Sequence, residues 1–219
     1  IAGVPTPYTA PTGEWTDTSP RFGLEQRWTP EVMTYLSVAK GYKAGGLNDT
    51  MVNAPGQTVC SPGTLPVSGT NPLNCGLTEF KPENLTNYEV GLRSEFMDRR
   101  VRLNATAFFS DYKDMQVQLI DQNPPPTQYN INADAEITGA EIELTALLTQ
   151  RLTVRASYGY TDAQYGSNIA SQTIPPPPRA QVPTLSTATP LLRAPKNSYT
   201  LAASFTQPLA NEAELLFDL

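Results

Sequence analysis

Side chains of alternating polarity recur along the chain in segments of about ten residues, and this period of two constrains the fold more than any other feature. In residues 101–110 the odd positions are apolar and the even positions are polar, with Phe108 as the exception. A helix would repeat its apolar positions every three or four residues instead. The pattern therefore predicts β-strands that have one apolar and one polar face.

The same alternation predicts further strands before and after this segment. The first two are less regular, because residues 33–39 are apolar on both faces. The predicted strands cover residues 20–28, 32–42, 87–95, 101–110, 139–146, 152–161, 197–206 and 212–219.

The connections between these strands alternate between short turns and long loops. Short turns fall at residues 29–31, 97–99, 148–150 and 208–211, and long loops at residues 43–83, 121–128 and 162–196. Barrels of the bacterial outer membrane have short periplasmic turns and longer extracellular loops. The spacing thus predicts an all-β antiparallel meander whose long loops 43–83 and 162–196 are extracellular.

The polar faces carry too many charges for the packed interior of a small barrel. Within a bilayer every backbone polar group needs a protein partner, so a membrane sheet has to close into a ring. The chain starts at Ile1 and stops within a predicted strand, from which we expect a segment of a larger barrel with a wide, wet or plugged lumen. The charged residues expected to face this lumen are Arg21, Glu25, Arg27, Glu89, Arg93, Glu95, Arg102, Glu141, Glu143, Arg155, Glu212 and Glu214.

Aromatic residues near the ends of the predicted strands have two interpretations. They can form the girdles that mark the two membrane interfaces, or they can be ordinary β-sheet packing residues. These residues are Trp28, Tyr35, Tyr42, Tyr112, Tyr158 and Tyr160.

Composition excludes several other classes of protein. The formal net charge of -6 does not suit a surface that binds nucleic acid. No apolar run approaches the roughly 18 residues of a membrane helix. Because the chain has no His and only two Cys, common zinc sites and Ser-His-Asp triads cannot be assembled. Cys60 and Cys75 are expected to form a disulfide in an oxidising compartment, or else to be unlinked thiols.

Several segments, in one order along the chain, resemble the barrel of TonB-dependent outer-membrane receptors of the siderophore type. Several matching segments are stronger evidence than one short motif. They are residues 19–25 (SPRFGLE), 35–48 (YLSVAKGYKAGGLN), 81–94 (KPENLTNYEVGLRS), 103–116 (LNATAFFSDYKDMQ), 132–143 (NADAEITGAEIE) and 194–199 (APKNSY).

The resemblance implies that residues 1–219 are the C-terminal portion of a barrel domain, about eight or nine strands of roughly 22. The plug domain and the final strands are absent from this segment. The implied function is uptake of a ferric siderophore across the outer membrane by a monomer energised by the TonB complex, without a cofactor or enzymatic activity. Alternatives are a receptor for cobalamin or glycans, a passive porin-like barrel, and a soluble β-sandwich binding protein.

Candidate ligand contacts lie in or beside the two longest loops, because loops on a rigid scaffold commonly carry binding residues. Each of them can also be an ordinary solvated loop residue. A separate pair, Glu141 and Glu143, has the spacing of two carboxylates on one strand face, which suits either a glycosidase or a lumen wall. The candidate ligand contacts are Lys43, Asn48, Asp49, Tyr165 and Arg179.

Overall fold

The computed structural model describes residues 13–48, 79–121, 127–169, 185–209 and 213–219, and these contain strands but no helix. Within these ranges no helix has the length and apolarity needed to cross a membrane. The strands are β1 (Arg21–Thr29), β2 (Val32–Lys43), β3 (Gly46–Leu47), β4 (Glu79–Phe80), β5 (Glu83–Phe96), β6 (Val101–Asp121), β7 (Thr127–Leu147), β8 (Leu152–Ile169), β9 (Asn197–Pro208) and β10 (Glu214–Asp218).

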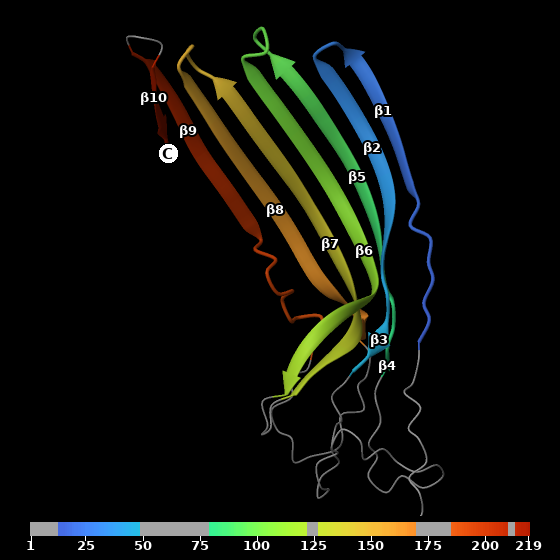
Figure 1. The fold of residues 1–219 in the computed structure, drawn as a ribbon. Helices are drawn as coiled ribbons and strands as arrows, with labels where there is room; N and C mark the ends of the chain where they lie inside the picture. The colour runs from blue at the N-terminus through green and yellow to red at the C-terminus, as the bar shows by residue number, and fades with distance from the viewer. Residues whose placement is uncertain (1–12, 49–78, 122–126, 170–184, 210–212) are drawn as a thin grey trace, which may run out of the picture.

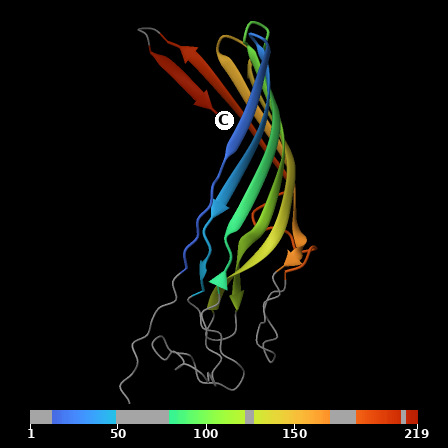
Figure 2. The same ribbon diagram turned by 90° about the vertical axis from the view of Figure 1, so that its right-hand side faces the viewer.

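Eight of the strands form one sheet in the order β1-β2-β5-β6-β7-β8-β9-β10, and β3 pairs with β4 in a small second sheet. Every neighbouring pair is antiparallel, which confirms the predicted meander. Figures 1 and 2 show a curved, open sheet with β1 at one edge and β10 at the other. The described part of the chain is thus a section of wall, not a closed ring.

The central strands are longer than the sequence pattern predicted. Strands β6 and β7 have 21 residues each. The predicted loop 121–128 is therefore strand at both of its ends, and residues 162–169 of the predicted loop 162–196 belong to β8. In β6 the alternation is interrupted at residues 110–114 (SDYKD), where a β-bulge shifts the register between Tyr112 and Met115.

The two faces of the sheet differ in polarity, as the alternation predicted. One row across the apolar face joins Leu24, Leu36, Val90 and Ala107 through directly opposed positions. Most large apolar side chains on this face are exposed. A large contiguous apolar surface of this kind is rare on soluble monomers. The exposed set on this face includes Phe22, Leu24, Leu36, Tyr88, Val90, Phe109, Ile142, Leu144, Tyr158, Tyr199, Leu201, Phe205 and Phe217.

Local hydrogen bonds fix two of the short turns. The Thr29 hydroxyl accepts from the backbone N–H groups of Glu31 and Val32, each at 3.1 Å. The Thr149 hydroxyl accepts from the N–H groups of Arg151 and Leu152 at 3.1 and 3.0 Å. A threonine side chain thus holds each turn, as serine and threonine do in many tight turns.

The turn between β5 and β6 is strained. Met97, Asp98 and Arg99 have φ angles of 54°, 54° and 65°, a left-handed run without any glycine. Arg100 then donates to the backbone oxygens of Leu147 (3.0 Å) and Leu148 (2.9 Å), so it joins this turn to the next one. A left-handed backbone conformation of this kind costs about 1–3 kcal/mol per residue, and it persists only where surrounding contacts enforce it.

Candidate functional site

The polar face of the wall contains a hydrogen-bonded group centred on Tyr35. Its hydroxyl donates to Glu89 Oε1 at 2.6 Å and lies 3.1 Å from Thr106 Oγ1. The Arg93 guanidinium lies 5.4 Å from the centre of the Tyr35 ring, within range of a cation–π contact. One tyrosine on β2 therefore connects to side chains on both β5 and β6.

Glycines on the polar face let aromatic rings lie flat across it. Gly91 is opposed by Tyr35 on one side and Thr106 on the other, and the Tyr35 ring occupies the space that a Cβ at position 91 would need. Phe108 lies over Gly139 in the same way. Phe108, the exception to the alternation, is therefore a polar-face residue placed over a glycine, an arrangement known to support weak glycine positions in sheets.

Beside this group the polar face is hollowed near the short turns. The hollow has a volume of about 540 Å³, and its lining runs across the polar face from β1 to β7, so the polar face is the concave one. Arg102 pairs with Glu95 at 2.8 Å, and Asn104 donates to Glu143 Oε2 at 3.4 Å. The residues lining the hollow include Arg27, Glu31, Tyr35, Arg93, Glu95, Arg102, Asn104, Thr106, Glu141 and Glu143.

At the opposite end of the wall the concave face becomes apolar. At the bulge, Asp114 has a φ of 54°, and beyond it the odd-numbered residues of β6 lie opposite concave-face residues of β7, as Val117 does with Ile131. The one-residue phase change turns the apolar side chains inward. They form a buried cluster of Val117, Leu119, Ile131, Ala133, Ala135 and Tyr165, with Tyr112, Met115, Leu185 and Leu191 packed against it.

Two asparagines next to this cluster hold the chain on both sides of the undescribed segment 49–78. The Asn48 side chain donates to the Asn130 carbonyl at 2.9 Å and accepts from its N–H at 2.6 Å. The Asn132 side chain accepts from the Lys81 N–H at 2.7 Å and donates to its carbonyl at 3.0 Å. Each side-chain amide makes the two hydrogen bonds that a paired backbone residue would make. Both flanks of the segment are therefore fixed to β7.

An ion pair ties the residues before β1 to the same end of the wall. Lys40 Nζ lies 2.7 Å from Asp17 Oδ1. The hydrogen bond from Lys40 is the main cause that lowers the pKa of Asp17, with a further contribution from the backbone N–H of Thr18. The pair therefore favours the ionised form of Asp17.

The structure places three of the predicted ligand contacts. Lys43 ends β2 and is exposed, whereas Asn48 is only 3% exposed and holds Asn130. Tyr165 lies in β8, not in a loop, and is 5% exposed within the apolar cluster. Asn48 and Tyr165 thus support the loop bases in this structure, and the ligand contacts of Lys43, Asn48 and Tyr165 stay predictions.

Four other predicted residues lie outside the described residues: Asp49, Arg179, Cys60 and Cys75. The predicted ligand contacts at Asp49 and Arg179, and the predicted disulfide between Cys60 and Cys75, stay predictions.

Of the two interpretations of the aromatic residues near strand ends, the girdle is wrong for Tyr35 and Tyr112. Tyr35 bonds to Glu89 on the concave face, and Tyr112 packs against the apolar cluster on that face. Trp28 and Tyr158 are exposed on the apolar face instead, at 67% and 45%. Tyr35 falls on the concave face because side chains alternate between the two faces of β2, and Tyr112 lies directly before the bulge. Position near a strand end therefore did not predict which face these two rings occupy.

Sequence reasoning missed Asn130, Asn132 and Gln116 as supports of the loop bases. Gln116 donates its side-chain amide to the carbonyl of Ala44 at 2.7 Å. An available signal was the polar alternation of Asn130 and Asn132 within a segment that otherwise reads as a strand. No group of three metal-ligating His, Cys, Asp or Glu side chains occurs among the described residues.

A curved antiparallel sheet with an exposed apolar face and a charged concave face is a section of the wall of a membrane β-barrel. A family model described as TonB dependent receptor-like, beta-barrel matches residues 3–215, so the chain belongs to the family of TonB-dependent receptors. This is a family of outer-membrane transport receptors, not of enzymes. Glu141 and Glu143 are accordingly wall residues.

Two curated proteins and one solved structure illustrate the relationship. The metal-pseudopaline receptor CntO of Pseudomonas aeruginosa is 25% identical over 146 residues, 67% of this chain and 17% of CntO. The probable TonB-dependent siderophore receptor PiuA of Acinetobacter baumannii is 25% identical over 96 residues, 44% of this chain and 12% of PiuA.

The crystal structure of the ferric yersiniabactin uptake receptor FyuA from Yersinia pestis aligns with a TM-score of 0.59 and 19% identity. The alignment covers 90% of this chain and 24% of FyuA, and it shows a shared fold. The chain therefore spans less than a quarter of each of these relatives.

Proposed function

We propose that the chain is a wall segment of an outer-membrane receptor that imports a metal chelate, most specifically a ferric siderophore, with energy from the TonB system. The observation that carries this proposal is the family match over residues 3–215. CntO and PiuA, the relatives with 25% identity, are named as receptors for metal-pseudopaline and for siderophores. Both names favour a chelated metal over cobalamin or a glycan.

Within this proposal the two ends of the wall have different tasks. The buried cluster and the Asn48 and Asn132 bonds form a rigid platform at the end where the long connections leave the sheet. Loops on a rigid base lose less conformational freedom when they bind a ligand. We therefore assign ligand capture to the extracellular segments within residues 43–83 and 162–196.

The concave face near the short turns would line the lumen of the intact receptor. Its carboxylates, guanidinium groups and amides suit a hydrated path or a polar partner inside the barrel. The apolar face would contact outer-membrane lipid. TonB would act through a plug domain elsewhere in the intact receptor, and we propose that the receptor is a monomer.

The test is ligand binding by the full-length receptor in detergent, titrated with ferric siderophores, metal-opine chelates, cobalamin and oligosaccharides. We expect submicromolar binding of a metal chelate and uptake that depends on TonB in cells. Lys43→Gln should weaken chelate binding, whereas Arg155→Gln, on the concave face near the short turns, should leave it unchanged. Tight binding of cobalamin or a glycan alone would overturn the proposed cargo.

The disulfide is a separate proposal within this function. A Cys60–Cys75 bridge would close a loop in the oxidising periplasm and cell surface, where such bonds persist. Intact-mass measurement before and after reduction and alkylation checks it. Two free thiols in protein from the outer membrane would contradict it.

A further inference from the structure

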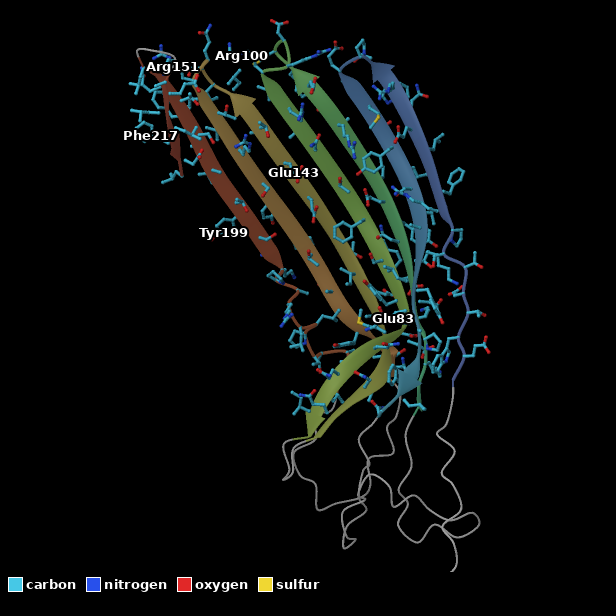
Figure 3. The ribbon with its side chains drawn as sticks, viewed as in Figure 1. Glu83, Arg100, Glu143, Arg151, Tyr199 and Phe217 are labelled. Atoms are coloured by element: carbon cyan, nitrogen blue, oxygen red, sulfur yellow. The ribbon has the colours of Figure 1, made fainter. Side chains whose placement is uncertain are left out.

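The short turns of the wall carry a repeated pair of side-chain types that the transport function does not use. The first residue after β5, β7 and β9 is a large exposed apolar one: Met97, Leu148 and Leu209. Arginines follow Met97 and Leu148 within the same two turns, at positions 99, 100 and 151. We call these six residues the turn rim, and Figure 3 labels Arg100 and Arg151 at this end of the sheet.

The turn rim is positive although the whole chain has a formal charge of -6. Three arginines stand in residues 97–100 and 148–151, against the single carboxylate of Asp98. The nearby Glu95 is already shared, since Arg102 lies 2.8 Å and Arg99 3.5 Å from its carboxylate. The turns 97–100 and 148–151 therefore carry a net positive charge, and Glu31 of the neighbouring turn lies beside Met97, Asp98 and Arg99.

The three arginines are held in place but retain donors for another acceptor. Arg100 is fixed by the carbonyls of Leu147 and Leu148. In the described part of the chain Arg151 donates from Nη1 to Gln207 Oε1 at 3.0 Å, and the Arg99 side chain is 74% exposed. A guanidinium has five N–H donors, so Arg99 and Arg151 can each still hold a phosphate oxygen pair.

The other end of the wall differs in its basic residues. The five lysines of the chain, at positions 40, 43, 81, 113 and 196, lie in the half of the wall towards the long connections, and Arg21 and Arg193 lie there as well. Lysine at those positions acts as a point charge, whereas the planar guanidinium matches phosphate with two parallel hydrogen bonds. The turn rim contains arginine and no lysine, and this favours a phosphate ligand.

The apolar part of the turn rim identifies the source of that phosphate. Met97 continues directly from Phe96, and Phe96 and Trp28 are exposed at the same end of the apolar face. Exposed apolar side chains beside arginines, continuous with a lipid-facing surface, are typical of protein that rests in the headgroup region of a bilayer. The left-handed backbone of residues 97–99 places Met97 and Arg99 in this turn despite its conformational cost.

We propose that the turn rim binds the phosphate groups of anionic phospholipids in the membrane leaflet that the short turns reach. Arg99 and Arg151 hold the phosphates, Met97, Leu148 and Leu209 enter the headgroup region, and Arg100 keeps the two turns together. The proposal rests on the outer-membrane placement in the proposed function, and it does not depend on which cargo is transported.

Native mass spectrometry of the full-length receptor tests this proposal. The receptor is purified in detergent and titrated with dioleoylphosphatidylglycerol or with dioleoylphosphatidylcholine, which is zwitterionic. We expect the wild type to prefer phosphatidylglycerol, and R99Q/R151Q to bind it about fivefold more weakly for each arginine removed. The R99Q/R151Q variant keeps the Arg100 bridge, and resistance of its folded form to unheated SDS checks that it has assembled.

The matched control is K81Q/K196Q, which removes the same charge from the other end of the wall. Lys81 resembles Arg99, since it is 70% exposed and lies 3.3 Å from its partner Asp114. This control should bind phosphatidylglycerol as the wild type does. Equal losses in both double variants, or no loss in R99Q/R151Q, would overturn the proposal.

A photo-crosslinking residue at position 98 separates the two classes of partner in cells. Adducts with phospholipid support the proposal, and adducts formed only with a periplasmic protein would refute it. If the wild-type receptor prefers phosphatidylglycerol but binds no metal chelate, the proposed function fails and the lipid proposal stands. The failure of one proposal can therefore be distinguished from the failure of the other.

Discussion

Replacing Gly91 by alanine should destabilise the wall by displacing one tyrosine. A Cβ at this position would meet the Tyr35 ring, with the phenolic oxygen 2.6 Å away. The ring would have to leave the sheet surface, because Gly91 lies between Tyr35 and Thr106 in one cross-strand row. Tyr35 would then lose its hydrogen bonds to Glu89 and Thr106 and its contact with Arg93.

The expected cost follows from these contacts. A hydrogen bond to a charged group contributes about 1.5–3 kcal/mol and a neutral one about 0.5–1.5 kcal/mol. The cation–π contact adds about 0.5–1 kcal/mol at an exposed site. Alanine offsets about 0.4–1 kcal/mol by restricting the unfolded chain. When these losses and the offset are combined, we expect Gly91→Ala to lower the free energy of unfolding by about 2–4 kcal/mol.

Urea unfolding of the full-length receptor in lipid vesicles, followed by tryptophan fluorescence, provides the measurement. Gly23→Ala is the matched control on the same face, because its Cβ would meet only the Leu36 carbonyl oxygen at 4.0 Å. It should be neutral or slightly stabilising. The decisive comparison is Gly91→Ala in a Tyr35→Ala background, where the cost should disappear; an unchanged cost there would refute the reasoning.

Three further predictions concern the apolar face, the loop base and the ion pair before β1. Leu103→Arg should impair membrane assembly by about 2–4 kcal/mol if this position lies near the bilayer centre, and Asn104→Arg on the other face much less, as vesicle-folding assays would show. Asn48→Ala removes two hydrogen bonds to β7, so it should lower the unfolding free energy by about 1–3 kcal/mol and weaken chelate binding, whereas equal binding would contradict a platform role. Because the Lys40 pair lowers the pKa of Asp17 below 3.8, its stabilisation is present above that pH and lost as the pH falls through the lowered pKa; Asp17→Asn should remove this acid dependence from the unfolding midpoint.

The alternation of polarity was sufficient to predict most of the wall. A strand with one face in lipid and one in a wet lumen must repeat every two residues, so residues 101–110 revealed their faces directly. Connection lengths predicted the order of neighbours, because short turns force antiparallel pairing of adjacent strands. The resemblance of several ordered segments predicted the family that the match over residues 3–215 shows.

The loop end could not be predicted in the same way. One extra residue at the Asp114 bulge changes which side chains face inward, and no periodic signal in the sequence marks such a change. Tyr165 and Asn48 were predicted to be loop residues because they lie within the long connections 162–196 and 43–83, although both are buried.

The sequence by itself determined that the chain forms a membrane wall, because the choice between lipid and water on each face is made residue by residue. Only the tertiary structure decided which residues support the loops, where Tyr35 and Phe108 lie over glycines, and how Arg100 joins two turns. These contacts join residues on different strands, so they depend on the register between strands. Register is a property of pairs of strands and follows from their hydrogen bonds and bulges.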